Sequence, residues 1–360
     1  MITAAELDAA LIADLPELAP DQREYHRKRA EDPHAGARRA GVGMKYLFCF
    51  LLLSFVALVQ DLPKEYASHF DYDARAPLDV KENSTQARGT VRVVDLSYAS
   101  PKGGRVTSYL VLPAGEGPFP AVVYSHWRNT EKSPQTSNRS EFLDEAVAYA
   151  KAGTVGFMID GVFVRPGFKA DSDPFSMQES EVLTQQVIDL RRAVDLLVRR
   201  KDVNPEKIAY VGHSYDAMVG GILRAVEPRF ATLVLMAGNY STRAEMNSDD
   251  PPIVAFRKQY GDDKINAYLD KVDWTDPVHY VSLQGKAPVL LQNATHDEFG
   301  SKAMFEKSAE AVAAPKAVKW YDSGHALNAD ARVDRYFWLR KYIGIGNVPE
   351  ETLTAIPELK

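Results

Sequence analysis

Cysteine is nearly absent from this chain, because Cys49 is the only one in 360 residues. A single cysteine excludes a disulfide framework and a cysteine-based zinc site. The eight histidines include no His-Glu-x-x-His spacing, so the sequence does not indicate a metalloprotease of that type. We therefore expect chemistry that uses neither a bound metal nor an organic cofactor.

An excess of positive charge is also missing. The 43 lysines and arginines are outnumbered by 49 aspartates and glutamates, which gives a net charge of -6. A nucleic-acid partner requires clustered basic residues to neutralise phosphates, so we expect none. The content of hydrophobic residues, 45%, is that of an ordinary globular protein. Nothing in the composition indicates an oligomeric state.

One long apolar run is present, at residues 44–60, after a charged segment at 1–43. Met44 and Lys45 begin this run, which is too short to span a membrane comfortably and is typical of a secretory signal peptide. We interpret Met44 as the translation start and residues 1–43 as an extension that is not translated. The mature protein would then be secreted or periplasmic, without stable membrane insertion. Two alternatives stay open: a membrane anchor, or a helix packed on a cytoplasmic protein.

Residues 61–347 have the pattern of a single α/β domain. Two β-rich runs, 91–97 and 106–112, flank the turn signal Pro101-Lys102-Gly103-Gly104 and predict an antiparallel hairpin. Short apolar runs then alternate with helical segments, which predicts a mostly parallel, twisted sheet with helices on both faces. The predicted strands of this part are 121–125, 155–159, 207–211, 232–236, 288–291 and 318–321.

Helical periodicity is clearest between residues 181 and 200, where Val187, Leu190, Val194 and Leu197 fall on one face. Residues 239–285 mix polar, aromatic and proline-rich pieces and predict a small helical cap. We expect substrate specificity to reside in this cap and in the loop at 161–180.

The stretch Gly212-His213-Ser214-Tyr215-Asp216 follows a buried strand and leads at once into a helix. This is the context of a nucleophile elbow, a sharp turn that projects a serine hydroxyl above the sheet. A side chain at position 212 would collide with such a turn. The helix N-terminus behind Ser214 supplies amide donors for developing negative charge.

The segments 202–208, 212–216 and 323–328 resemble the dienelactone-hydrolase-like and acyl-esterase branch of the α/β-hydrolases. The resemblance covers roughly residues 90–343. Enzymes similar to dienelactone hydrolase proper carry cysteine as the nucleophile, whereas this chain has Ser214. The resemblance therefore implies an α/β-hydrolase fold and a serine hydrolase that cleaves the carboxylic ester of a small acyl substrate.

The order of residues in this fold is nucleophile, acid, histidine. Asp297 follows a late predicted strand, where the family places its acid, and His325 is then the only histidine downstream. Glu298 is a reserve acid. Asp297 would orient His325, which takes the serine proton as the base. The oxyanion hole is expected to use the backbone amide of Tyr215 and, by the family pattern, that of Trp127.

Asp216 departs from the family pattern, which has glycine at the end of the elbow. The carboxylate must be accommodated, must complement the positive end of the helix, or must lie near the forming oxyanion and weaken catalysis. Three functions therefore remain open. They are an ester hydrolase, a peptidase or thioesterase with the same triad, and a non-catalytic binding protein that keeps the fold.

Overall fold

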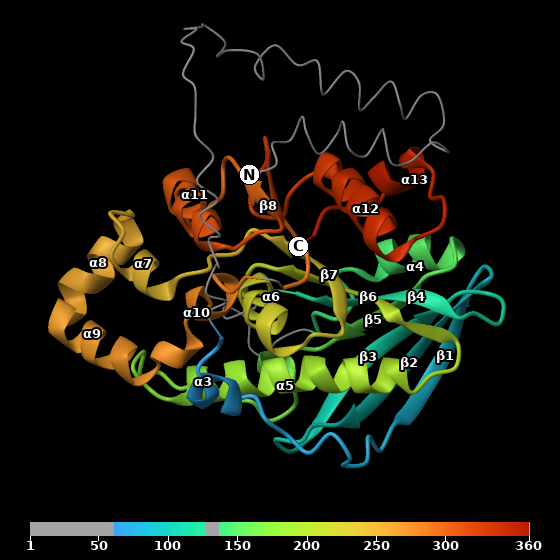
Figure 1. Ribbon diagram of the computed structural model, residues 1–360, viewed down its shortest axis with the longest axis horizontal. Helices are drawn as coiled ribbons and strands as arrows, with labels where there is room; N and C mark the ends of the chain where they lie inside the picture. The colour runs from blue at the N-terminus through green and yellow to red at the C-terminus, as the bar shows by residue number, and fades with distance from the viewer. Residues whose placement is uncertain (1–60, 127–136, 285, 360) are drawn as a thin grey trace, which may run out of the picture.

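The computed structural model describes residues 61–126, 137–284 and 286–359, and a twisted sheet of nine strands runs through their centre (Figure 1). The spatial order is β1-β2-β3-β5-β4-β6-β7-β8-β9. The first three pairs in this order, β1-β2, β2-β3 and β3-β5, are antiparallel. The remaining pairs, from β5-β4 to β8-β9, are parallel. The strands are β1 (Lys81–Arg88), β2 (Val91–Ala99), β3 (Arg105–Leu112), β4 (Phe119–Ser125), β5 (Val155–Ile159), β6 (Val203–His213), β7 (Phe230–Met236), β8 (Val289–Ala294) and β9 (Lys316–Tyr321).

This arrangement confirms the predicted α/β class, the parallel core of the sheet and the hairpin made by β2 and β3. Strand β1 was not predicted. All eight of its residues are exposed, so it lacks the alternation by which a half-buried strand is recognised. Its pairing with β2, from Lys81 opposite Ser97 to Arg88 opposite Val91, places it at the edge of the sheet.

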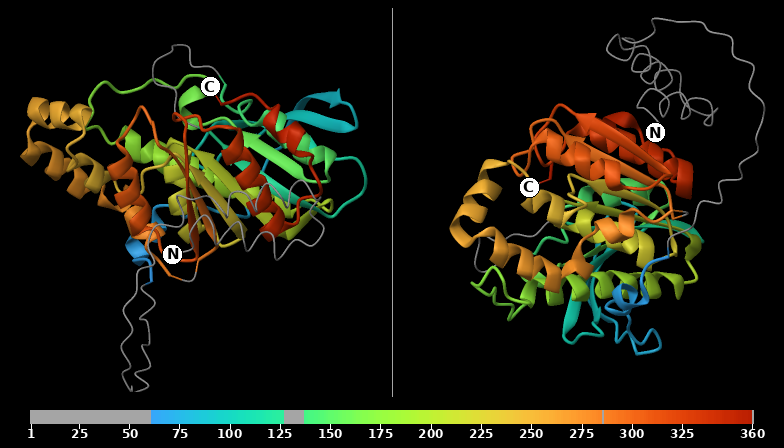
Figure 2. Two further views of the ribbon diagram at one scale, coloured as in Figure 1. Left: turned by 90° about the horizontal axis from the view of Figure 1, so that it is seen from above. Right: turned by 60° about the vertical axis from the view of Figure 1, so that its left-hand side comes forward.

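Helices cover both faces of the sheet, as predicted (Figure 2). Helices α5 (Gln178–Val198) and α6 (Tyr215–Val226) pack in one apolar cluster. Helices α4 (Leu143–Lys151) and α12 (Ala329–Ile343) contribute to a second cluster on the opposite face. Helix α11 (Lys302–Ala311) connects β8 to β9.

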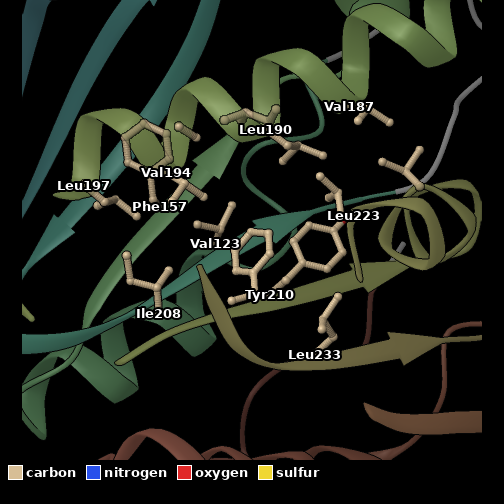
Figure 3. Packing of buried hydrophobic residues seen from close by; sticks show 14 of the residues in the cluster. Val123, Phe157, Val187, Leu190, Val194, Leu197, Ile208, Tyr210, Leu223 and Leu233 are labelled. Carbon is tan, nitrogen blue, oxygen red and sulfur yellow. The ribbon is translucent and has the colours of Figure 1, made fainter. Parts of the chain in front are cut away.

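The apolar face of α5 is the one that its periodicity predicted. Val187, Leu190, Val194 and Leu197 are completely buried and point toward the sheet (Figure 3). They meet side chains of the central strands, including Phe157 and Tyr210, in the same cluster. Burial of aliphatic side chains contributes about 1.5–3 kcal/mol each, so this face anchors α5 firmly.

The cap between β7 and β8 is helical, in agreement with the prediction for residues 239–285. It contains α7 (Thr242–Met246), α8 (Pro251–Tyr260), α9 (Asp262–Lys271), a 3₁₀ turn (Asp273–Thr275) and α10 (Val278–Val281). Figures 1 and 2 show α7, α8 and α9 as a group at one side of the sheet. Gly261 joins α8 to α9 with φ +82°, a conformation that glycine adopts without strain.

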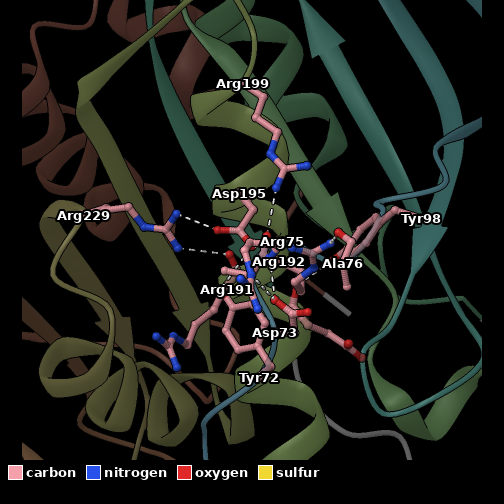
Figure 4. A network of polar contacts seen from close by, with 12 residues as sticks. Tyr72, Asp73, Arg75, Ala76, Tyr98, Arg191, Arg192, Asp195, Arg199 and Arg229 are labelled. Carbon is pink, nitrogen blue, oxygen red and sulfur yellow. Dashed lines mark hydrogen bonds and ion pairs between the residues drawn. The ribbon is translucent and has the colours of Figure 1, made fainter.

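Arginines fasten the segment before β1, which includes α3 (Lys64–Ser68), to the body of the domain (Figure 4). Arg191 donates to the carbonyl oxygen of Phe70 at 2.7 Å, and Arg192 donates to the carbonyl oxygen of Ala76 at 2.8 Å. Asp195 on α5 pairs with Arg192 at 2.6 Å, which balances the buried guanidinium. The segment at 64–76 is therefore an integral part of the fold.

The packed domain continues beyond residue 347, where the sequence pattern ended it. Helix α13 (Glu350–Thr354) contributes the buried Leu353, and Arg332 donates to the carbonyl oxygen of Leu353 at 2.9 Å. Within the three described ranges, no helix combines the length and the apolar character needed to cross a bilayer. The predicted signal segment at 44–60 and the extension at 1–43 lie outside the described residues.

Candidate active site

Ser214 lies at the sharp turn between β6 and α6 and has an uncommon backbone conformation. Its φ is +59° and its ψ is -120°, which is strained for a residue with a side chain. A hydrogen bond from its amide to the carbonyl oxygen of Met236, at 2.8 Å, holds the turn against the end of β7. Such strain at the junction of a strand and a helix is characteristic of a nucleophile elbow.

Gly212 makes the turn possible by leaving room for the first turn of α6. A Cβ atom at this position would collide with the carbonyl oxygen of Asp216 and lie 2.7 Å from the Tyr210 ring. Tyr210 uses its hydroxyl to donate to that same carbonyl oxygen at 2.7 Å. The absence of a side chain at 212 therefore allows α6 to begin immediately after Ser214.

Asp297 and His325 are 28 positions apart in the sequence and form a direct pair. The imidazole Nδ1 lies 2.8 Å from one carboxylate oxygen of Asp297 and 3.0 Å from the other. The carboxylate is almost completely buried, with 1% of the side chain exposed, whereas 15% of the His325 side chain is exposed. Because a carboxylate accepts hydrogen bonds, Nδ1 carries the proton and Nε2 is the basic nitrogen of the neutral ring.

Two further side chains hold the backbone of His325. The carboxylate of Glu298 accepts a hydrogen bond from its amide at 2.9 Å. The Nε2 of His213 lies 2.8 Å from its carbonyl oxygen and donates to it, because a carbonyl group only accepts. The peptide groups on both sides of the His325 side chain are therefore fixed, and the residue is tied directly to the neighbour of Ser214.

These two contacts were not predicted from the sequence. Glu298 was the reserve for the triad acid, but its carboxylate contacts the backbone of His325, whereas Asp297 contacts the ring. The His213 ring also packs against two other histidines, with its centroid 4.8 Å from that of His325 and 5.0 Å from that of His126.

The protonation of His213 follows from its surroundings. Burial lowers its pKa to about 3, and the positive charge that His325 can carry acts in the same direction. The ring is therefore neutral, and because Nε2 donates to His325, Nδ1 is an acceptor. His126 completes the arrangement by donating from its Nδ1 across 3.3 Å.

Of the two residues whose amides were predicted for the oxyanion hole, the structure describes one. Tyr215 is the first residue of α6, in the turn where backbone amides lack acceptors within the helix, as the prediction requires. Trp127 lies outside the described residues. The strand that precedes it ends beside the elbow, because Ser125 of β4 is in register with Gly212 of β6.

Asp216 is accommodated by burial, and its side chain does not point to solvent. Only 2% of the residue is exposed, and its Oδ1 accepts a hydrogen bond from Nε2 of Gln186 on α5 at 3.0 Å. The same nitrogen of Gln186 lies 3.1 Å from the Ser125 hydroxyl. Burial raises the pKa of Asp216 to about 7, against the opposing effect of the hydrogen bonds from Gln186 and Ser125.

Because the pKa of Asp216 is raised in the folded state, the free energy of unfolding should depend on pH. A carboxyl group whose pKa is higher in the folded state binds its proton more tightly there, so stability falls as pH rises from about 4 to about 7. Asp216→Asn removes the ionisation. We expect the free energy of unfolding of the variant, relative to the natural chain, to increase over this window by at most about 4 kcal/mol.

Urea unfolding of both proteins at pH 4 and pH 8 measures this difference. Asp144→Asn is the matched control, because Asp144 is exposed and pairs with Arg88 on the surface. An equal effect of Asp216→Asn at both pH values would show that the carboxyl group titrates normally in the folded protein.

An exposed aromatic ring lies beside the imidazole. Phe299 is 74% exposed, and its ring centroid is 4.6 Å from that of His325 in an edge-on arrangement. Its amide donates to Asp297 at 2.9 Å, which fixes the start of this loop. Within the described part of the chain, no group of three potential metal ligands is found, and the neighbouring His296 contacts Asp322 at 2.9 Å.

Comparison with solved structures identifies the fold. The acetyl xylan esterase of Paenibacillus sp. R4 superposes with a TM-score of 0.61 at 18% identity, over 78% of this chain and 92% of that one. Acetyl xylan esterase 1 of Thermoanaerobacterium sp. JW/SL YS485 gives 0.61 at 16% identity, over 78% and 95%. A prolyl endopeptidase gives 0.53 at 17% identity, over 71% and 39%. The chain has the α/β-hydrolase fold.

Sequence comparison is less extensive. No protein-family model matches the chain. A curated relative, polyketide transferase ATR5 of Stachybotrys chlorohalonatus (strain IBT 40285), is 30% identical over 122 residues, which are 33% of this chain. The chain spans 36% of the length of this relative.

Proposed function

We propose that this chain is a serine hydrolase that cleaves carboxylic esters through an acyl-enzyme formed on Ser214. One observation carries the proposal: the strained serine at the N-terminus of α6 and the Asp297–His325 pair are joined through His213. His213 precedes Ser214 in the chain and bonds to the backbone of His325, which supports the proposal that the base lies beside the nucleophile.

In the proposed reaction, His325 Nε2 takes the proton of the Ser214 hydroxyl as the oxygen attacks the ester carbonyl carbon. The tetrahedral intermediate then expels the alcohol, which leaves with that proton. Water repeats the sequence on the acyl-enzyme and releases the carboxylic acid. Asp297 holds the Nδ1 proton throughout and stabilises the imidazolium that forms at each step.

The negative oxygen of each intermediate would be stabilised by the Tyr215 amide and by the dipole of α6. One oxyanion donor contributes roughly 3–4 kcal/mol to lowering the barrier. Trp127 is proposed as the second donor on the family pattern alone. Below about pH 7 the Asp216 carboxyl is mostly protonated and brings no charge to the first turn of α6, which is compatible with an oxyanion nearby.

Esters are proposed as the substrates because the two solved neighbours with TM-scores of 0.61 are named acetyl xylan esterases. A prolyl endopeptidase shares the fold, so peptides remain a second candidate, as do thioesters with the same triad. The name of the curated relative supports transfer of the acyl group to an acceptor other than water. Matched ester, thioester and anilide substrates, each with and without an added alcohol, separate these reactions by their products.

Labelling with a fluorophosphonate tests the central claim. We expect one stable adduct on Ser214 of the folded protein and none on Ser214→Ala, because only an activated serine attacks the probe at a useful rate. Mass spectrometry of the digested protein locates the adduct. Folded protein that stays unlabelled would favour the non-catalytic binding protein.

We also propose that the protein is exported after cleavage of the segment that begins at Met44. N-terminal sequencing of the mature protein tests this, and a product that retains residue 1 inside the cell would contradict it. Support for export comes from the sequence pattern of residues 44–60 alone.

A further inference from the structure

A cavity of about 370 Å³ lies between the cap helices and the loop that precedes α5. One wall comes from residues 171–179, and the other comes from residues 242–269 of the cap. These belong to the two segments in which we expected specificity to reside. The volume is that of a small organic group, within the usual range of ligand sites.

Each wall is connected to the neighbourhood of Ser214, one through packed rings and the other through a short stretch of chain. The Tyr215 ring, next to Ser214, packs edge-on against Phe163 at 5.3 Å, and Phe163 packs against Phe168 at 5.5 Å. The other wall follows β7, whose last residue, Met236, bonds to the Ser214 amide. Thr242 comes six residues later, so it lies at most ~20 Å from Met236. The cavity is therefore within reach of the remote end of an extended substrate.

The lining combines aromatic rings with carboxylates. Phe175 is central, with its ring centroid 6.0 Å from that of Phe256 and 5.6 Å from that of Tyr268. Of the described residues that line the same cavity, three carry carboxylates, namely Asp171, Asp173 and Glu179, and none is a lysine, arginine or histidine. Aromatic faces and carboxylates both attract cations, whereas they disfavour anions.

Two contacts support this electrostatic character. The ammonium of Lys264 lies 4.3 Å from the centre of the Phe175 ring, so this ring does attract a cation. The charge of Lys264 offsets only one of the three carboxylates of the lining, which leaves an excess of negative charge. Burial raises the pKa of Tyr268, and the charges of Glu179 and Asp173 act in the same direction, because both carboxylates lie near this side chain of the cavity wall. Its hydroxyl donates to the carbonyl oxygen of Ser176 at 3.2 Å and keeps the two walls together.

We propose that this cavity binds the remote end of the substrate and selects a cationic group carried on an apolar or aromatic body. This inference rests on the proposed function, because only a hydrolase would turn the bound molecule over as a substrate. Binding in the cavity does not itself require catalysis. It narrows the substrate class from esters in general to esters of cationic amphiphiles. Neutral aromatic ligands and anionic ligands are the competing classes.

Three soluble probes of equal size test the choice of charge on the full chain. They are 4-phenylbutylamine, 4-phenylbutan-1-ol and 4-phenylbutyrate, and calorimetry gives the dissociation constant of each. We expect the ammonium to bind at least tenfold more tightly than the carboxylate, with the alcohol between them. Equal binding of the ammonium and the carboxylate, or no binding of any probe at millimolar concentration, would overturn the proposal.

Variants locate the site. Asp173→Asn combined with Glu179→Gln should reduce the difference between ammonium and carboxylate to threefold or less, and Phe175→Leu should weaken both the ammonium and the alcohol. Asp144→Asn removes an exposed carboxylate from the surface pair with Arg88 and should change neither result. Thermal unfolding verifies that each variant is folded. Unchanged discrimination in the double variant, together with unchanged affinity of the ammonium and the alcohol in Phe175→Leu, would overturn the proposal.

The outcomes separate this inference from the proposed function. Labelled Ser214 with no charge discrimination in the cavity refutes the substrate class and leaves the hydrolase. Charge discrimination without labelling of Ser214 supports a site for cationic ligands and refutes the hydrolase.

Discussion

Hydrolysis of p-nitrophenyl acetate is expected to fall on the order of 10⁶-fold in Ser214→Ala, to the small rate that binding and the oxyanion donors alone support. The loss should be in kcat, because the hydroxyl forms a bond in the transition state and contributes little to holding the substrate. Alanine keeps the Cβ atom at φ +59°, so the elbow carries the same backbone strain as before. Absorbance of released p-nitrophenol measures the rate.

The control for this variant is Ser84→Ala, on the exposed edge strand β1, which should retain full activity. Circular dichroism and a melting curve show whether each variant is folded. Undiminished turnover by folded Ser214→Ala would mean that another group is the nucleophile, whatever the shape of the elbow.

Asp297→Asn is expected to lower kcat by roughly 10⁴-fold with little change in KM. The amide side chain is nearly isosteric, but it can donate to Nδ1 of His325 and so favour the tautomer whose Nε2 carries the proton. A protonated Nε2 does not accept the proton of Ser214. Loss of the carboxylate charge also removes the stabilisation of the imidazolium. Steady-state kinetics at pH 8 measures both parameters.

Two neighbouring acids provide matched comparisons. Asp322→Asn removes a carboxylate that contacts the exposed His296 and should leave kcat unchanged. Glu298→Gln keeps an oxygen that accepts the amide hydrogen of His325, so it should retain most activity. A large loss in Glu298→Gln together with normal activity in Asp297→Asn would move the role of the acid to Glu298.

Local sequence pattern predicted the parts of the fold that local forces determine. The face of α5 followed from the spacing of Val187, Leu190, Val194 and Leu197, because the helical period alone brings these side chains together. The turn at Ser214 followed from a glycine between an apolar strand and a helix. Strand β1 was missed because its residues are polar and exposed, and only its register with β2 defines it.

The surroundings of the site depend on contacts between distant segments, which a single sequence does not reveal. Asp216 was recognised as unusual, but its burial depends on Gln186 from α5 and on Ser125 from β4. Similarly, the bond from His213 to His325 joins residues 112 positions apart. The pair Asp297–His325 was predictable only because the order of the triad in the chain is known for the fold.

The anchoring of His325 on both sides of its side chain limits how the base can move during a reaction. Glu298 holds the amide and His213 holds the carbonyl oxygen, so the main chain at His325 is held in place. In the proposed reaction this residue takes the proton of the serine and then gives it to the departing alcohol. Only rotation about the two side-chain torsions of the ring remains. In the proposed reaction we therefore expect the base to act through side-chain rotations, which in proteins take picoseconds to nanoseconds for exposed residues.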